Sequence, residues 1–156
     1  MPDDLPLHLR PITFAANELA FDLIYLLQSY SGKDLESVLI MLYVTDATMR
    51  PFMLATPPTN DILAAARPPN EIRGAISRRM IADKTGLSRE TVRRKTQELS
   101  EAGLIVIDEA DRIRSAQRLD EPDFQRVIEA AHRAVMRYRQ RLEAFGVPWD
   151  CVRPPS

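Results

Sequence analysis

The chain has 156 residues, of which 45% are hydrophobic, and its 21 Lys and Arg residues almost balance its 22 Asp and Glu residues, giving a net charge of −1. This length and composition suit one compact unit, or a small domain with helical extensions. There is no run of about 18 apolar residues that would span a membrane. The single cysteine, Cys151, excludes an internal disulfide framework. Because the start MPDDLPLHLR is acidic and unlike a secretory signal, we expect a cytoplasmic protein.

The N-terminal part of the chain, residues 1–50, predicts a helical extension. Apolar residues recur at helical spacing over 15–30 and again over about 34–48. Both segments are more apolar than a lone surface helix, so each must pack against another element. That element is either the C-terminal helix of the same chain or a second chain.

A proline-rich linker is predicted at residues 51–72. Prolines break long helices, because they lack the backbone N–H and clash with the preceding turn. A short helix over 60–67 still fits between the two proline pairs. The linker prolines are Pro51, Pro57, Pro58, Pro68 and Pro69.

Residues 76–107 predict two short helices joined by a tight turn and followed by a strand. Ser77 is placed to cap a first helix that begins at Arg78. Gly86 then interrupts the pattern, and a glycine can adopt the positive φ that such a turn requires. Ser88 is expected to cap a second helix that begins at Arg89.

The second helix, at about residues 89–99, predicts one buried face and several cationic ones. Val92, Thr96 and Leu99 are spaced to lie on the buried face. Residues 104–107 and 113–119 then predict two strands with a turn at 108–111. Arg112 and Arg114 alternate with a buried position, so both guanidinium groups are expected to face away from the core.

The central third of the chain, about residues 73–119, resembles the winged helix-turn-helix of bacterial transcription regulators, of the MarR, GntR and Crp types. The resemblance implies a mainly α fold with a small β-wing, flanked by N-terminal helices and a long C-terminal helix. It also implies a function in transcription regulation through double-stranded DNA. The residues that carry the resemblance are Ala82, Gly86, Leu87, Val92, Leu99, Gly103, Leu104 and Ile105.

Positive charge is concentrated on this segment, since residues 71–100 contain eight Arg and Lys against four Asp and Glu. A local basic band suits phosphate binding. A recognition helix presents the side chains of its first turns to base edges in the major groove. The acidic turn at 108–111 would repel phosphate, so wing contacts are assigned to two arginines. The predicted DNA-binding residues are Arg78, Arg79, Ser88, Arg89, Thr91, Arg93, Arg94, Lys95, Arg112 and Arg114.

A long helix is predicted at residues 120–147, followed by a tail at 148–156. Its apolar residues repeat in steps of four and three, which is typical of a helix that packs along its whole length. A homodimer is the favoured interpretation, because helix-turn-helix proteins commonly bind two half-sites. The repeat consists of Phe124, Ile128, Ala131, Val135, Tyr138, Leu142 and Phe145.

Two other functions compete with DNA binding by a simple regulator. One is a winged helix that binds another protein, although such a helix would more often show an apolar or mixed-charge face. The other is a regulator that senses a small-molecule effector. Apolar residues around Tyr25, Tyr30, Met41 and Tyr43 would permit a pocket, although core packing explains them more simply.

No catalytic, metal or cofactor site is expected. His8 and His132 are far apart, and neither has a neighbour at metal-ligand spacing. The sequence shows no phosphate-binding glycine loop, nucleophile elbow or paired-carboxylate site. We therefore expect neither an enzyme nor a membrane protein.

Overall fold

The computed structural model describes residues 5–54 and 57–152. Residues 1–4 of the predicted acidic start, 55–56 of the predicted linker and 153–156 of the predicted tail lie outside the described residues. In the described ranges, no helix is long and apolar enough to cross a membrane.

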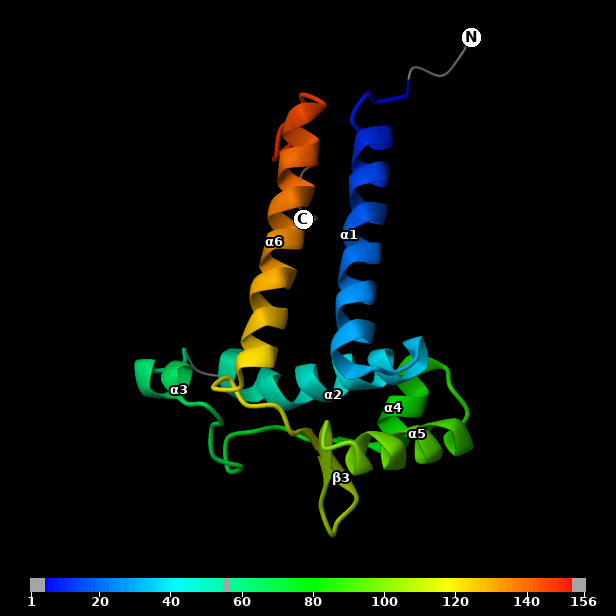
Figure 1. Ribbon diagram of the computed structural model, residues 1–156, viewed down its shortest axis with the longest axis vertical. Coiled ribbons are helices and arrows are strands. Elements are labelled where there is room, and N and C mark those ends of the chain that lie inside the picture. Colours follow the sequence, from blue (N-terminus) through cyan, green and yellow to red (C-terminus); the bar gives the residue numbers. More distant parts are fainter. Residues whose placement is uncertain (1–4, 55–56, 153–156) are drawn as a thin grey trace. The chain divides into compact units, whose positions relative to one another are not determined.

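The described chain is mainly helical and carries a small sheet (Figure 1). In chain order the elements are α1 (Leu9–Ser31), α2 (Leu35–Leu54), α3 (Asn60–Ala64), β1 (Ile76–Ser77), α4 (Arg78–Thr85), α5 (Arg89–Glu101), β2 (Ile105–Ile107), β3 (Arg112–Ser115) and α6 (Pro122–Ala144).

The chain divides into two compact units, and the division falls within α1 and α6. Residues 28–125 form the central unit. Residues 1–27 and 126–156 form the helical unit. The central unit contains α2 to α5 and the whole sheet. It therefore joins the predicted helix-turn-helix and wing, at 73–119, to α2 and α3, which the sequence assigned to the N-terminal extension and the linker.

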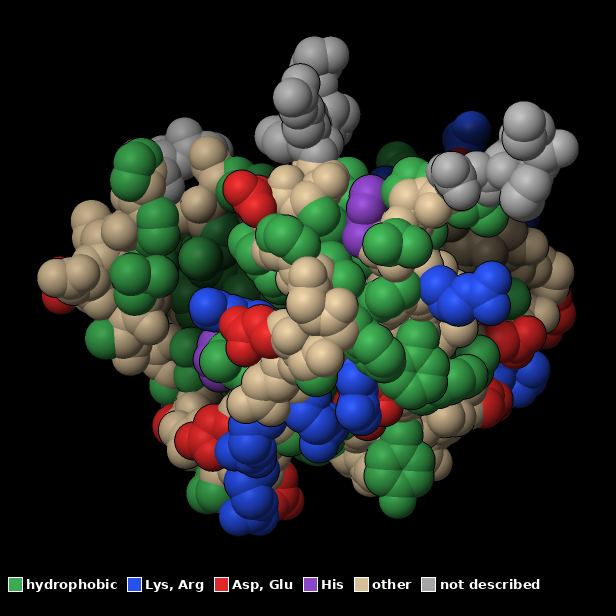
Figure 2. All heavy atoms as spheres, turned by 90° about the horizontal axis from the view of Figure 1, so that it is seen from above, with side chains coloured by type: hydrophobic (Ala, Val, Ile, Leu, Met, Phe, Trp, Pro, Cys, Tyr) green, Lys and Arg blue, Asp and Glu red, His purple; other side chains and the backbone are tan. Residues whose placement is uncertain are grey.

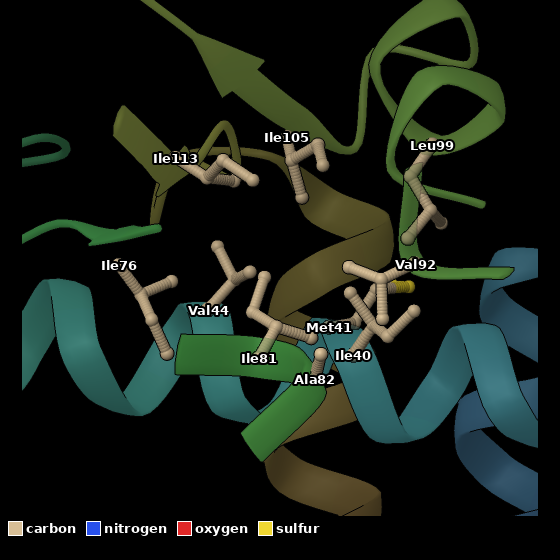
Figure 3. Close-up of a cluster of buried hydrophobic side chains, with 10 residues drawn as sticks. All are labelled: Ile40, Met41, Val44, Ile76, Ile81, Ala82, Val92, Leu99, Ile105 and Ile113. Carbon is tan, nitrogen blue, oxygen red and sulfur yellow. The ribbon is translucent and has the colours of Figure 1, made fainter. Parts of the chain in front are cut away.

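The core of the central unit lies where α2, α4, α5 and the sheet meet (Figure 3). Ile40 and Val44 of α2 are fully buried, and Ile81 of α4 packs into the same cluster. Val92 and Leu99 of α5 are also fully buried, as their helical spacing predicts. Burying each such side chain contributes about 1.5–3 kcal/mol, so this apolar cluster holds α5 in place.

The sheet is antiparallel, and its strand order is β1-β3-β2. Its central strand β3 pairs Ile113 with Ile76 of β1 and Ile107 of β2. Because side chains alternate along a strand, Ile113 enters the core while Arg112 points outward. The two predicted strands of the wing are confirmed, with shorter bounds, and β1 is an addition that the sequence did not indicate.

Helix α2 is longer than predicted. It was expected to end near Thr48, but it continues through Pro51 to Leu54. Proline removes one hydrogen bond to the preceding turn, and the chain at Gly74 packs against that part of the helix. The N–H of Gly74 donates to the carbonyl of Thr48 at 3.1 Å. The short helix predicted between the proline pairs is present as α3.

The helical unit consists of two antiparallel helix segments, from α1 and α6, that lie side by side (Figure 1). Its small core contains Ala15 and Leu142, with Val147 beyond the end of α6. Two ion pairs also join the helices, Arg141 with Glu18 and Arg137 with Asp22, each at 2.7 Å.

The predicted fold class is confirmed, since a mainly helical chain carries a three-stranded antiparallel sheet in a winged helix-turn-helix arrangement.

Many large apolar side chains are not covered, and hydrophobic groups lie among the charged ones on the face drawn in Figure 2. In the helical unit they include Phe21 and Tyr25, which are 71% and 75% exposed.

Candidate nucleic-acid interface

The helix-turn-helix is built as its capping residues predict. The Ser77 hydroxyl oxygen accepts from the N–H of Met80, and the Ser88 hydroxyl oxygen accepts from the N–H of Thr91. Each serine therefore satisfies a backbone donor that the first turn of a helix leaves free. Between the helices, Gly86 adopts the left-handed conformation with φ 74°. Both helix starts and the turn are confirmed.

Four arginines at the starts of α4 and α5 border one open surface hollow of about 310 Å³. We call Arg78, Arg79, Arg89 and Arg93 the arginine cluster. Two come from the first turn of α4 and two from the first two turns of α5. The free N–H groups at a helix start add positive partial charge, so the hollow suits an anion such as a phosphate group.

The members of the arginine cluster differ in how strongly they are held by intramolecular partners. Arg93 pairs with Glu90 at 2.7 Å, and this contact raises the pKa of Arg93 and lowers that of Glu90. Arg79 lies 4.0 Å from Asp83 and is 81% exposed. Arg89 has no hydrogen bond or ion pair to any of the described residues. Ion pairs as exposed as Arg93–Glu90 are weak, because water screens both charges, so a phosphate can replace the carboxylate.

Arg94 does not line this hollow and pairs with Glu98 at 3.0 Å, one turn further along α5. Ser88 and Thr91 are occupied with each other, because the Ser88 hydroxyl also donates to the Thr91 hydroxyl at 2.8 Å. Thr91 is half-buried. These three residues lie beside the cluster on α5 or at its cap.

Lys95 does not belong to the DNA-facing surface that the sequence predicts. The residue is only 2% exposed, and its ammonium group donates to Asp34 and also pairs with Glu36 at 3.3 Å. These carboxylates raise the pKa of Lys95, and the contact with Lys95 lowers the pKa of Asp34 to about 2. The prediction for Lys95 is corrected: the residue joins α5 to the start of α2.

The wing is organised by Asp108, which accepts four hydrogen bonds. Its carboxylate accepts from the N–H groups of Ala110 and Arg112, and from the guanidinium groups of Arg112 and Arg114, at 2.9–3.0 Å. These contacts lower the pKa of Asp108 to about 2, with the Arg112 N–H as the largest cause. The Asp108 charge is therefore satisfied inside the wing and does not act as a free repulsive group.

The two wing arginines have different surroundings. The Arg112 side chain is well exposed, whereas that of Arg114 is only 14% exposed and its Nε is buried without a partner among the described residues. Both arginines line the same hollow on the face of the sheet opposite Ile113, so both face away from the core, but Arg114 is largely covered. The cause is tertiary: the chain segment around Arg67 and Arg73 lies against this side of the sheet.

Arg78 connects the helix-turn-helix to the wing. Its Nε donates to the Thr96 hydroxyl at 3.0 Å, and its Nη1 donates to Asp111 in the wing turn. Two carboxylates of the acidic turn, at Asp108 and Asp111, are thus paired with arginines. Sequence reasoning missed this connection, because Arg78 and Asp111 are far apart in the chain and no local pattern marks them as partners.

The described ranges contain no group of three His, Cys, Asp or Glu side chains that would hold a metal ion. The residues suggested for an effector pocket have different surroundings. Met41 is buried in the core of the central unit, with Tyr30 and Tyr43 packed against that core. Tyr25 is in the helical unit and is exposed.

A small winged sheet beside two short helices joined by a tight turn is the architecture of a winged helix-turn-helix domain. Comparison with protein families agrees, since residues 53–121 match the Crp-like helix-turn-helix domain. The match runs from the end of α2 through the wing to the residue before α6. It indicates a DNA-binding transcription regulator and does not support the MarR or GntR types. No curated protein and no solved structure matched the chain.

Proposed function

We propose that this chain is a sequence-specific regulator of transcription that places the start of α5 in the major groove of double-stranded DNA. The arginine cluster is the observation that carries the proposal. It gathers four guanidinium groups at two helix starts, and its lining contains no Asp or Glu among the described residues. The Crp-like match over residues 53–121 supports the same function.

We assign different roles in DNA binding to the arginines of α4 and those of α5. Arg89 and Arg93 extend from the first two turns of α5, where arginine can donate two hydrogen bonds to guanine. Arg78 and Arg79 belong to α4, which in such proteins crosses the DNA backbone. Phosphate contacts position a protein without selecting a sequence.

The remaining predicted residues take supporting roles. Arg94 can exchange Glu98 for DNA, and Arg112 provides the wing contact. Ser88 and Thr91 orient the start of α5 and can donate to a phosphate. Lys95 and Arg114 are left out of the proposed interface, because one is buried in an ion pair and the other lies largely inside the wing.

The decisive experiment is selection of bound duplexes from a random pool, followed by affinity measurements on the enriched sequence. Arg89→Ala should weaken binding by about 1–3 kcal/mol and relax the preference at one base pair. Arg79→Ala should weaken binding to all sequences and reduce the salt dependence by about one phosphate contact.

Arg139→Ala provides the matched control, since Arg139 is an exposed arginine of α6 paired with Glu143. It should bind DNA like the unchanged protein. Failure to enrich any sequence, or equal affinities for Arg89→Ala, Arg79→Ala and Arg139→Ala, would contradict the proposed interface. A protein-binding winged helix would then be the better interpretation.

We further propose that the protein acts as a homodimer formed through the helical unit. Its two helices cover each other along one side only, and apolar residues remain exposed on both. Phe14, Phe21 and Tyr25 follow one side of α1, while Ile128 and Val135 of α6 are 44% and 42% exposed. Pairing two such hairpins as a four-helix bundle would cover these groups and supply one α5 for each half-site.

A further inference from the structure

A second hollow in the central unit is apolar and has no role in the proposed DNA contact. Its volume is about 260 Å³, and it lies between the C-terminal half of α2, the short helix α3 and the chain that follows β3. Met49 and Phe52 come from α2, Leu63 comes from α3, and Leu119 and Phe124 close the other side. A cavity of about 150 Å³ can hold benzene, so this one accommodates a bicyclic or medium-chain body.

Two arginines lie at the boundary between this apolar hollow and the polar hollow that Glu71 and Asp108 line. Arg67 and Arg73 both line the apolar hollow, and none of the described residues that line it is Asp or Glu. Neither arginine forms an ion pair with a described residue. Burial lowers the pKa of Arg73, and the positive charges of Arg67 and Arg114 lower it further. A bound anion would relieve this repulsion.

We propose that the apolar hollow is a binding site for a small organic acid. The apolar body of the ligand would fill the space between α2 and α3, and its carboxylate would be bound by Arg67 and Arg73. The planar guanidinium fork of arginine matches a carboxylate, and a few polar groups at an apolar pocket fix the orientation of a ligand. Binding at this hollow does not depend on the proposed DNA interface.

The same two arginines also hold the end of the wing. Arg67 donates to the carbonyl of Ala116, and Arg73 donates to the carbonyl of Ser115. The N–H of Ser115 in turn donates to the Thr48 hydroxyl at 2.9 Å. A carboxylate that competes for these guanidinium groups would release the chain after β3. On the proposed DNA-binding function, the organic acid is therefore an effector that alters the wing contact.

Calorimetry with 2-naphthoate and octanoate tests the site directly. At least one acid should bind with a dissociation constant below about 1 mM, as expected for a ligand of this size. The matching alcohol, 2-naphthalenemethanol or 1-octanol, should bind at least about tenfold more weakly, because it lacks the negative charge. Inorganic phosphate alone should not compete, since it has no apolar body.

Two pairs of variants locate the binding. Leu63→Trp fills the hollow and Arg67→Gln removes one cation, so each should weaken binding about tenfold or more. Leu54→Trp and Arg118→Gln change an exposed leucine and an exposed arginine outside the lining, and both should bind the acid normally. Circular dichroism of each variant checks that the fold is intact.

The proposal is overturned if neither acid binds, if the alcohols bind as well as the acids, or if Leu63→Trp and Arg67→Gln bind like their controls. The effector role has a separate test, in which the acid changes the affinity for the selected duplex in the unchanged protein but not in Leu63→Trp. If the unchanged protein binds the acid but binds no duplex, only the DNA-binding proposal is contradicted.

Discussion

Lys95 shows how one residue can change its role between sequence and structure. In the sequence it belongs to a dense row of cations, yet its ammonium group lies inside the protein between Asp34 and Glu36. A buried ammonium group needs partners, because leaving water costs it several kcal/mol. Asp34 is also the residue before α2 and accepts from the N–H of Ser37 at 2.9 Å.

Asp34→Asn separates these two roles of the side chain. Asparagine caps helices as well as aspartate does, so only the charged contact with Lys95 is lost. We expect the free energy of unfolding to fall by about 1–2 kcal/mol, the effect being moderated by the exposure of Asp34 to water. Urea titration measures this change. Asp46→Asn is the control, since it breaks an exposed pair with Arg50 on the same helix; an equal loss would contradict the special role of Asp34.

The same contact predicts a pH dependence. The pKa of Asp34 is about 2 in the folded protein, below its usual value of 3.8. A lowered carboxyl pKa stabilises the fold at pH values above the unfolded pKa, and the stabilisation is lost as pH falls through the folded pKa. The stability difference between the unchanged protein and Asp34→Asn should be constant above about pH 5, fall as the pH is lowered, and vanish only below the folded pKa of about 2. A difference that persists at the acid end would show that the charge is not its source.

At the scale of elements, Gly74 brings the chain before β1 close against α2. A Cβ on Gly74 would clash with the carbonyl oxygen of Ala47 and would stand 2.8 Å from Cγ of Pro51. Neither group can move without bending the helix. Gly103 differs, since a Cβ there would meet open space and only its φ of 73° favours glycine.

Gly74→Asn and Gly103→Asn should therefore behave differently. Asparagine tolerates the left-handed conformation, so the change at Gly103 should cost less than about 1 kcal/mol. At Gly74 it forces the segment away from α2, and we expect a loss of at least about 1–3 kcal/mol, as in other overpacked sites. Thermal and urea unfolding measure both variants. Equal stability of the two variants would mean that the close approach does not matter.

The charged residues of the wing have partners that the sequence did not predict. Its strands and turn were predicted from alternation, but the partners of its arginines were not. Asp108 accepts from both Arg112 and Arg114, and Arg78 of α4 reaches Asp111. Charge along the sequence therefore overstated both the free positive charge of the wing and the repulsion at its tip.

At the scale of the whole molecule, the central question is how the helical unit covers its apolar surface. Phe21 of the proposed dimer surface is 71% exposed in the single chain. The substitution Phe21→Glu places a negative charge at this position. Burying an unpaired carboxylate in an interface is costly. We therefore expect this variant to sediment as a monomer at about 10 μM, a concentration at which the unchanged protein should sediment as a dimer. It should also bind a palindromic duplex more weakly than the unchanged protein.

Ala16→Glu is the matched control, since it adds the same charge at an exposed position of α1 on the side away from Phe14 and Phe21. It should leave the molecular mass in solution unchanged. If the unchanged protein is a single chain at this concentration, or if both variants behave alike, the proposed dimer surface is wrong. The DNA interface of a single chain would not be affected by that result.

The sequence by itself determined the local features of this protein. The caps at Ser77 and Ser88, the turn at Gly86 and the buried face of α5 follow from short-range chemistry, since each depends on residues within one or two helical turns. The basic band at 71–100 also follows from composition, and with it the expectation of DNA binding.

Only the tertiary structure decided which charges are free. Lys95 and Asp34 are 61 positions apart, and Arg78 and Asp111 are 33 apart, so no sequence period links them. The continuation of α2 through Pro51, the partial burial of Arg114 and the apolar hollow beside Arg67 and Arg73 depend in the same way on packing between distant segments. Long-range packing is set by the shapes and charges of surfaces that meet only after folding, which is why local patterns could not reveal it.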